Sequence, residues 1–204
     1  ALVGICSLLG ELCDSLDVTY ADNESFNFVT NLEHLLEIYR SYFDFIDYVN
    51  RGHYFDLDML DVGNSLFKDR EDFLTEDEQI VAYSARAFLN SPIQISANLE
   101  SVSEFDLALY CNEEIIAINQ DALADFPDEL RKDDTIRIYK RALENGDIGY
   151  ALFNMTAEER EETIDLPECA AIREVWTKEN LPAASNLVCK LPPHGARIFR
   201  VTPA

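Results

Sequence analysis

The chain of 204 residues is poor in basic side chains: 16 Lys and Arg face 39 Asp and Glu, giving a formal net charge of −23. Such a charge repels nucleic-acid phosphate and anionic lipid, so we expect neither as a partner. Glycine and proline are scarce, at seven each, which excludes collagen-like and linker-dominated chains. No apolar run approaches the roughly 20 residues that a membrane-spanning helix needs.

Closely spaced cysteines are also absent. The five cysteines include no C-x-x-C pair, and His53 and His194 have no partners at metal-ligand spacing, so we expect no metal site. One cysteine of the five is left over after pairing, as a free thiol or a link to another chain. The candidate disulfides are Cys169 with Cys189 and Cys6 with Cys13.

Two N-glycosylation sequons are relevant to the cellular location of the protein. Asn23-Glu24-Ser25 and Asn154-Met155-Thr156 are compatible with N-glycosylation in a secreted protein. The apolar start of the chain lacks a basic region and a cleavage site, so we interpret residues 1–9 as a buried strand and not as a signal peptide. The acidic residues are spread along the chain, which is also compatible with an acidic compartment, where protonation neutralises part of their charge.

The first part of the chain has an α/β pattern. Apolar residues recur at helical spacing, and Thr75 followed by Glu78 forms the capping-box signature at the start of one helix. Pro92 ends that helix. We expect helices over 31–49, 76–89, 103–111 and 112–119, and strands over 1–9, 54–60 and 92–99.

Near residue 125 the pattern becomes all-β. The polar, proline-containing segment 125–134 marks a predicted domain boundary between residues 124 and 125. Asn145-Gly146 between apolar runs is a strong hairpin signal. Short alternating runs predict an antiparallel sandwich over 125–204. Its expected strands are 135–143, 148–154, 162–166, 172–177, 185–191 and 196–201.

Three stretches in the same order resemble the family 27 glycoside hydrolases, the α-galactosidases and α-N-acetylgalactosaminidases. Residues 55–64, FDLDMLDVGN, are similar to that family's NDPDMLxxGN strand, and residues 115–123, IIAINQDAL, to its VIAINQDPL. Residues 191–198, LPPHGARI, are similar to its closing PPHGxxLL strand. A complete (β/α)₈ barrel needs about 250 residues. The resemblance therefore implies the C-terminal part of such a barrel over 1–124, an antiparallel β-sandwich over 125–204, and no cofactor.

The resemblance also assigns candidate site residues. A retaining glycosidase needs a nucleophile and an acid/base; the family's nucleophile strand has no counterpart here, and Glu11 falls at the acid/base position. Ser7 stands where the family has an arginine, whose loss removes a bidentate donor for sugar hydroxyls. Tyr54 replaces a tryptophan and, with Asp56 and Asp58, occupies the family's substrate-binding strand.

Two functional hypotheses follow from the resemblance. The first is a catalytically degenerate, α-galactosidase-like polypeptide, inactive alone, that acts as a structural or binding subunit of a secreted assembly. The second is the C-terminal chain of a proteolytically processed lysosomal or vacuolar α-galactosidase or α-N-acetylgalactosaminidase, with its nucleophile on another chain. Both imply a partner chain that supplies the missing barrel half, or a homo-oligomer, and an α-galactosyl glycan as ligand.

Overall fold

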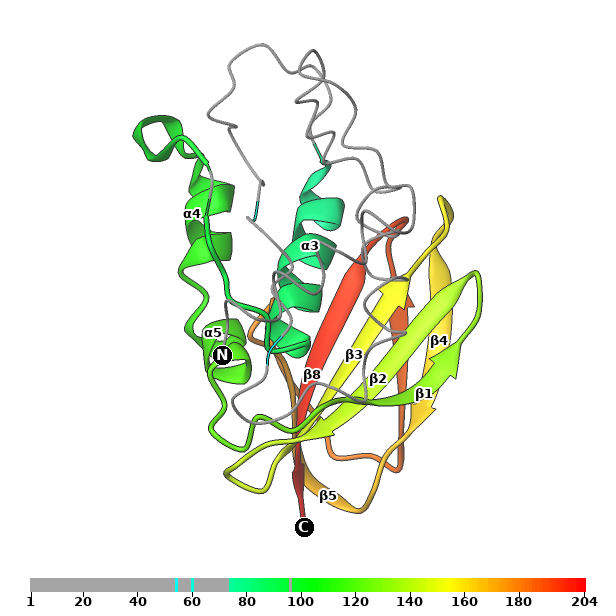
Figure 1. Ribbon diagram of the computed structural model, residues 1–204. Coiled ribbons are helices and arrows are strands. Elements are labelled where there is room, and N and C mark those ends of the chain that lie inside the picture. The colour runs from blue at the N-terminus through cyan, green and yellow to red at the C-terminus, as the bar shows by residue number, and fades with distance from the viewer. Residues whose placement is uncertain (1–53, 55–59, 61–73, 96) are drawn as a thin grey trace, which may run out of the picture.

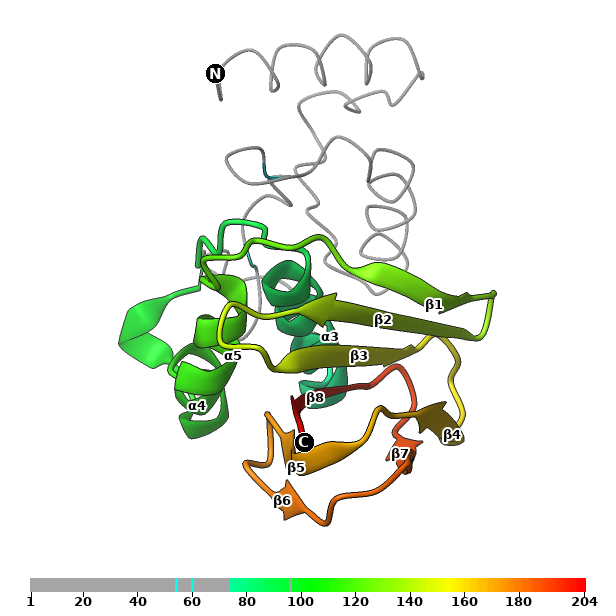
Figure 2. The ribbon, with the colours of Figure 1, turned by 90° about the horizontal axis from the view of Figure 1, so that it is seen from below.

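A computed structural model of the chain (Figure 1) describes Tyr54, Leu60 and residues 74–95 and 97–204, which form three layers. A six-stranded sheet lies between a layer of helices and a small two-stranded sheet (Figures 1 and 2). The helices are α3 (Glu76–Phe88), α4 (Glu104–Tyr110), α5 (Glu113–Asn119) and the 3₁₀ helix η2 (Leu99–Ser101). The strands are β1 (Asp128–Lys132), β2 (Ile136–Ala142), β3 (Ile148–Asn154), β4 (Arg160–Asp165), β5 (Cys169–Glu174), β6 (Asn180–Leu181), β7 (Asn186–Leu191) and β8 (Ala196–Pro203).

The helices begin at capping residues that the sequence supplies. The Thr75 side chain accepts a hydrogen bond from the Glu78 backbone N–H, and the Glu78 carboxylate accepts one from the Thr75 N–H at 2.7 Å. This confirms the predicted capping box of α3. Ser103 and Asp106 form the same reciprocal pair at the start of α4. The predicted helices over 76–89, 103–111 and 112–119 are thus confirmed to within two residues at each end.

All strand pairs within the two sheets are antiparallel, in the order β1-β2-β3-β8-β5-β6 and β4-β7. The β2–β3 hairpin turns at Asn145-Gly146, where Gly146 has a φ of +88°, a value that favours glycine. The predicted antiparallel β-sandwich is therefore confirmed. The alternating pattern missed β1 because every residue of this edge strand is exposed, and it missed β6 because that strand has only two residues.

The central strands have apolar side chains on both faces, which creates two cores. On β3, Leu152 faces the two-stranded sheet, whereas Ala151 and Phe153 face the helices. The core between the sheets contains, on the six-stranded side, Ile136, Ile138, Tyr150, Leu152, Ile172, Phe199 and Val201, and on the other side Ile164, Leu166, Leu187, Cys189 and Leu191. Because the helix-side core draws on residues from both sides of position 124, the helices and the sheet share apolar packing.

The barrel half expected over 1–124 is not found among the described residues. In place of a continuous strand over 92–99, the structure has bridge residues at Ile95 and Ala97, of which Ile95 pairs in parallel with Leu60, followed by η2. The Leu60 N–H donates to the Gln94 carbonyl at 2.6 Å in this bridge. The expected helix over 31–49 and strand over 1–9 lie outside the described residues. No helix of the described part is long and apolar enough to cross a membrane.

An ion pair fastens α5 to the sheet. Arg173 on β5 donates to the Glu114 carboxylate through Nε and through Nη2, the latter at 2.6 Å. Both side chains are less than one quarter exposed. The hydrogen bond from Arg173 lowers the pKa of Glu114, against the opposing effect of burial.

This pair makes a testable contribution to the pH dependence of stability. Since the pKa of Glu114 is lower in the folded chain, its stabilisation is complete above the usual glutamate pKa of about 4.3 and is lost as the pH falls below it. Glu114→Gln should cost about 1 kcal/mol at pH 7 and almost nothing near the acid limit. Urea unfolding of both proteins between pH 7 and 3 measures the difference; a constant difference would contradict the assignment.

Candidate functional site

A buried arginine joins the ends of two helices to the sheet. Arg141 lies on the helix-facing side of β2 and is 1% exposed. Its Nη1 donates to the Phe88 carbonyl at 2.9 Å and to Asn90 Oδ1, and its Nη2 donates to the Ile118 carbonyl at 2.6 Å. These acceptors lie at the carboxyl ends of α3 and α5, where the helix dipole favours a cation.

The electrostatics of Arg141 follow from its burial. Loss of solvation lowers its pKa to about 10, while the carboxylates of Asp121 and Asp125 act in the opposite direction. Arg141 is therefore charged at neutral pH. Its guanidinium carbon also lies 5.6 Å from the centre of the Phe88 ring, a cation–π arrangement.

The segment Asn119-Gln120-Asp121 completes this junction. Asn119 ends α5, and its Nδ2 donates to the Ser91 carbonyl at 2.8 Å. The Asp121 carboxylate accepts the Glu144 N–H from the β2–β3 turn at 3.0 and 3.1 Å. Through these contacts the end of α5 is joined to the loop after α3 and to the sheet.

A cavity of about 380 Å³ lies beside the junction. Tyr54, which is 41% exposed, lines it together with residues that follow α3 and α5. The full lining is Tyr54, Asn90, Ser91, Pro92, Asn119, Gln120, Asp121, Ala122 and Ala124.

Of the predicted site residues, the structure describes Tyr54, which lines this cavity beside the helix junction. Its role in substrate binding stays a prediction. The other predicted site residues, Glu11, Asp56 and Asp58, lie outside the described residues, as do Asn23, Cys6 and Cys13.

Trp176 connects the sheet to α3. It follows β5 and packs on the helix side of the sheet. Its Nε1 donates to Ser84 Oγ on α3 at 2.8 Å, and its ring meets Tyr83 edge to face at 5.7 Å. Strand β5 ends at Glu174, which lets the tryptophan turn toward α3.

The disulfide proposed between Cys169 and Cys189 is not formed. Both residues are free thiols, on strands that belong to different sheets. Cys169 Sγ donates to the Ala184 carbonyl at 3.4 Å. Cys189 lies in the core between the sheets, and this burial raises the pKa of its thiol to about 11, which makes it unreactive.

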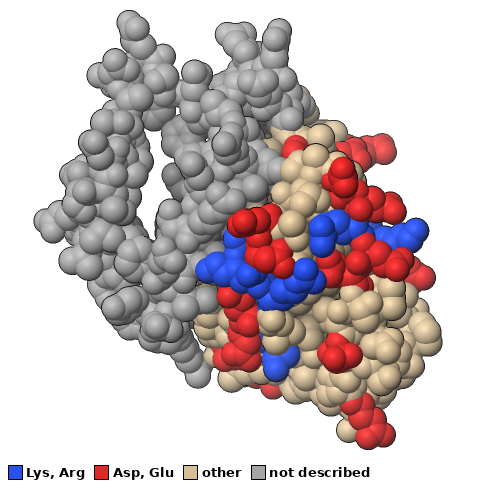
Figure 3. All heavy atoms as spheres, turned by 90° about the vertical axis from the view of Figure 1, so that its right-hand side faces the viewer, with Lys and Arg blue, Asp and Glu red and all other residues tan. Residues whose placement is uncertain are grey.

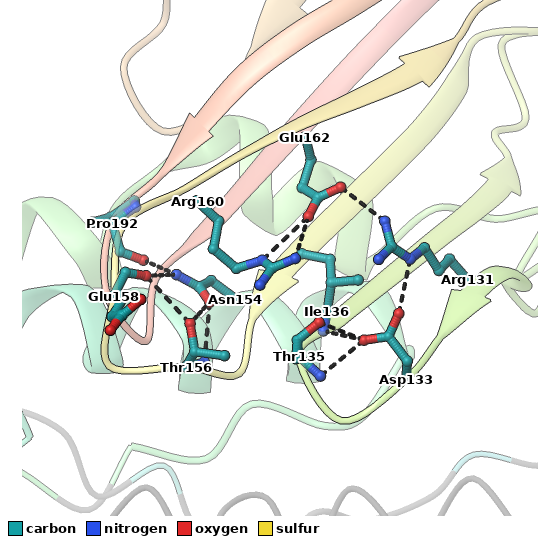
Figure 4. Close-up of polar contacts among 10 residues, drawn as sticks. All are labelled: Arg131, Asp133, Thr135, Ile136, Asn154, Thr156, Glu158, Arg160, Glu162 and Pro192. Atoms are coloured by element: carbon teal, nitrogen blue, oxygen red, sulfur yellow. Dashed lines mark hydrogen bonds and ion pairs between the residues drawn. The ribbon is translucent and has the colours of Figure 1, made fainter.

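The sequon at Asn154 also requires correction. Asn154 is 1% exposed, and its Nδ2 donates to the carbonyls of Glu158 and Pro192 at 2.7 and 2.8 Å (Figure 4). Its Oδ1 accepts from the N–H and the hydroxyl of Thr156. Both amide hydrogens of this buried side chain therefore bond to main-chain carbonyls in the folded chain. Asn-x-Thr serves here as a turn.

Beside this turn, charged groups neutralise one another. The Glu162 carboxylate accepts from Arg131 and from Arg160, each at 2.9 Å, and Arg131 also contacts Asp133 (Figure 4). Figure 3 shows basic and acidic side chains interleaved over this face. The hydroxyl and N–H of Thr135 hold the pKa of Asp133 well below its usual range. This shift, like that of Glu114, is opposite to the one a general acid requires.

Comparison with known sequences shows which domain the sandwich resembles. Residues 133–201 match the α-galactosidase C-terminal β-sandwich domain. Similar proteins include α-galactosidase A of Cellvibrio japonicus, 26% identical over 173 residues, and an α-galactosidase of rice, 25% identical over 163 residues. Each alignment covers 76% of this chain, which spans only 41% and 37% of the lengths of those relatives.

Solved structures agree on the fold. A family 27 β-L-arabinopyranosidase from Geobacillus stearothermophilus has a TM-score of 0.75 at 23% identity, covering 84% of this chain and 42% of that one. α-Galactosidase I from Mortierella vinacea has a TM-score of 0.71 at 20% identity, covering 83% and 45%. The resemblance that the sequence motifs carry is thereby confirmed.

The junction around Arg141 predicts a large stability effect. Arg141→Met leaves the Phe88 carbonyl and Asn90 Oδ1 without the guanidinium and leaves the Ile118 carbonyl with only the Asp121 N–H at 3.4 Å, so we expect a loss of about 3 kcal/mol in the free energy of unfolding. Lys190→Met, at a side chain 70% exposed, is the control and should cost less than about 0.5 kcal/mol. Urea unfolding measures both. Equal effects would show that Arg141 does not hold the junction.

From the turn at Asn154 we predict that this sequon carries no glycan. In a host that glycosylates secreted proteins, peptide mass analysis should find Asn154 unmodified in the folded product. Thr156→Ala, made in a host without glycosylation, should cost about 1 kcal/mol because the Asn154 Oδ1 contact is lost. A glycan on Asn154 would contradict this structure of the turn.

Proposed function

We propose that the chain is a catalytically degenerate, α-galactosidase-like polypeptide, because its residues 133–201 match the α-galactosidase C-terminal β-sandwich domain. It acts as a non-catalytic structural or binding subunit of a secreted assembly, with an α-galactosyl glycan as the ligand of that assembly. Its partner is a chain that supplies further barrel strands. The sequon at Asn23 supports the secretory location.

The observation that carries this proposal is the junction around Arg141. This buried cation uses three hydrogen bonds to hold helix ends against the sheet, and Asp121 and Asn119 serve the same junction. These polar groups form the hydrogen bonds that hold the helices against the sheet. A cavity of about 380 Å³ lies beside them, lined by Tyr54 and by residues that follow α3 and α5.

The substitutions at the family's motif positions support loss of catalysis. Glu11 is one methylene longer than the aspartate that the family has, and misplacement by about 1 Å can cost about 100-fold in rate. Ser7 cannot replace the donor fork of an arginine. Leu57 and Tyr54 further alter the strand that resembles the substrate-binding one.

Hydrolysis of 4-nitrophenyl α-D-galactopyranoside tests the proposal. The chain alone should release nitrophenol no faster than buffer, with an intact α-galactosidase as the positive control. Turnover that Glu11→Gln abolishes would contradict the proposal. Turnover that appears only when a second chain is added, and that depends on Glu11, would instead support the alternative of a processed, two-chain α-galactosidase.

A further inference from the structure

The turn between β2 and β3 contains the one Asn-Gly step of the sequence, and both residues, Asn145 and Gly146, are exposed. This turn lies next to the end of α5, where the Asp121 carboxylate accepts the Glu144 N–H (Figure 2). Apart from chain neighbours, no atom of the described residues lies within 4 Å of the point where a side chain on Gly146 would start. Solvent therefore reaches the Asn-Gly step directly.

An asparagine that precedes a glycine can lose its side-chain amide. The backbone nitrogen of the glycine attacks Cγ of the asparagine, a new C–N bond forms, and the amide group leaves with the glycine proton as ammonia. Water then opens the five-membered succinimide at either carbonyl, which gives aspartate or isoaspartate. The reaction needs no oxidant or cofactor, and glycine favours it because no side chain hinders the ring.

In the folded chain, the groups that must react are held by hydrogen bonds. The Gly146 N–H, which supplies the attacking nitrogen, donates to the Leu143 carbonyl at 2.9 Å. The side chain of Asn145 is bonded twice to Asp147: its Oδ1 accepts the Asp147 N–H at 3.0 Å, and its Nδ2 donates to Asp147 Oδ2 at 2.9 Å. The succinimide ring can therefore close only after these hydrogen bonds have opened.

Asp147 is itself held in place from two sides. It is 8% exposed, and its carbonyl accepts the Leu143 N–H at 2.9 Å. Its Oδ2 also lies 3.4 Å from Nε of Arg200 on β8. The carboxylate that bonds the amide of Asn145 is thus fixed to the sheet, although the amide belongs to an exposed turn.

We propose that Asn145 is a deamidation site and that Asp147 suppresses the reaction while the β2–β3 hairpin is folded. This inference is independent of the proposed function. Deamidation replaces the Nδ2 donor by a carboxylate oxygen opposite Asp147 Oδ2, so that an attractive contact becomes a repulsive one.

The product also reaches the junction between the helices and the sheet. Isoaspartate at position 145 adds one methylene group to the backbone of the turn, directly after Glu144. The Glu144 N–H donates to the Asp121 carboxylate beyond the end of α5. Deamidation therefore loosens the contact of this turn with α5.

The rate of deamidation in the full chain tests the proposal. The chain is incubated in mildly alkaline buffer, and peptide mass analysis with fragmentation follows the conversion of Asn145. The reference is a synthetic peptide of residues 142–160, which trypsin also releases from the chain. Since the reaction in the folded chain is limited to molecules whose turn is open, the chain should convert at least about tenfold more slowly than the peptide.

Two variants separate the contact with Asp147 from general stability. Asp147→Ala should bring the rate in the folded chain to within about threefold of the rate in a peptide with the same substitution. Thr156→Ala weakens a different turn, at Asn154, and is the matched control that should leave Asn145 protected. Circular dichroism checks that both variants are folded.

A stability measurement keeps the proposal testable if Asp147→Ala does not fold. Asn145→Asp, which reproduces one product, should lower the urea midpoint of unfolding. The same substitution should lower it less in an Asp147→Asn background, where an amide can donate to the new carboxylate. The proposal is overturned if the folded chain converts as fast as the peptide, if Asp147→Ala and Thr156→Ala accelerate conversion alike, or if Asn145→Asp leaves the midpoint unchanged.

Discussion

The described part of the chain depends on one buried positive charge. Arg141 is carried by the sheet, yet its hydrogen-bond acceptors are the last carbonyl of α3, a carbonyl in the last turn of α5 and the side chain of Asn90. The carbonyls at a buried helix end need hydrogen-bond donors, and a guanidinium supplies several in a fixed plane. Without it, the Phe88 carbonyl would face the sheet without this donor. The relative placement of helices and sheet therefore rests on this contact together with the apolar core between them.

Two kinds of polar arrangement can be separated in this molecule. Those around Arg141, Asn154 and Glu114 are buried or half-buried, and each fixes one segment against another. The pairs over the outer strands, such as Lys190 with Glu159, are exposed and add little to stability. No group of three or more His, Cys, Asp or Glu residues that could hold a metal ion occurs within the described residues.

Local patterns predicted the local structure well, because they act within a few residues. The capping box at Thr75, the turn at Gly146 and the alternation along β2, β3 and β8 depend on neighbours in sequence. β1 could not be found that way, since an exposed polar edge strand is defined only by the strand beside it. The alternation along β2 puts Arg141 on the other face of the strand from Ile136 and Ile138. The burial of an arginine there is explained only by the helix ends that accept its hydrogen bonds.

The sequence by itself determined the sandwich and its family, through alternation, turn residues and the motifs at 115–123 and 191–198. Tertiary structure alone decided the state of individual side chains. The sequence motif at Asn154 indicates a glycosylation site, but in the structure its amide donates to two carbonyls. The sequence likewise suggests a disulfide between Cys169 and Cys189, whereas the structure shows free thiols on different sheets. Burial and hydrogen-bond commitment depend on residues distant in sequence, and a motif does not encode them.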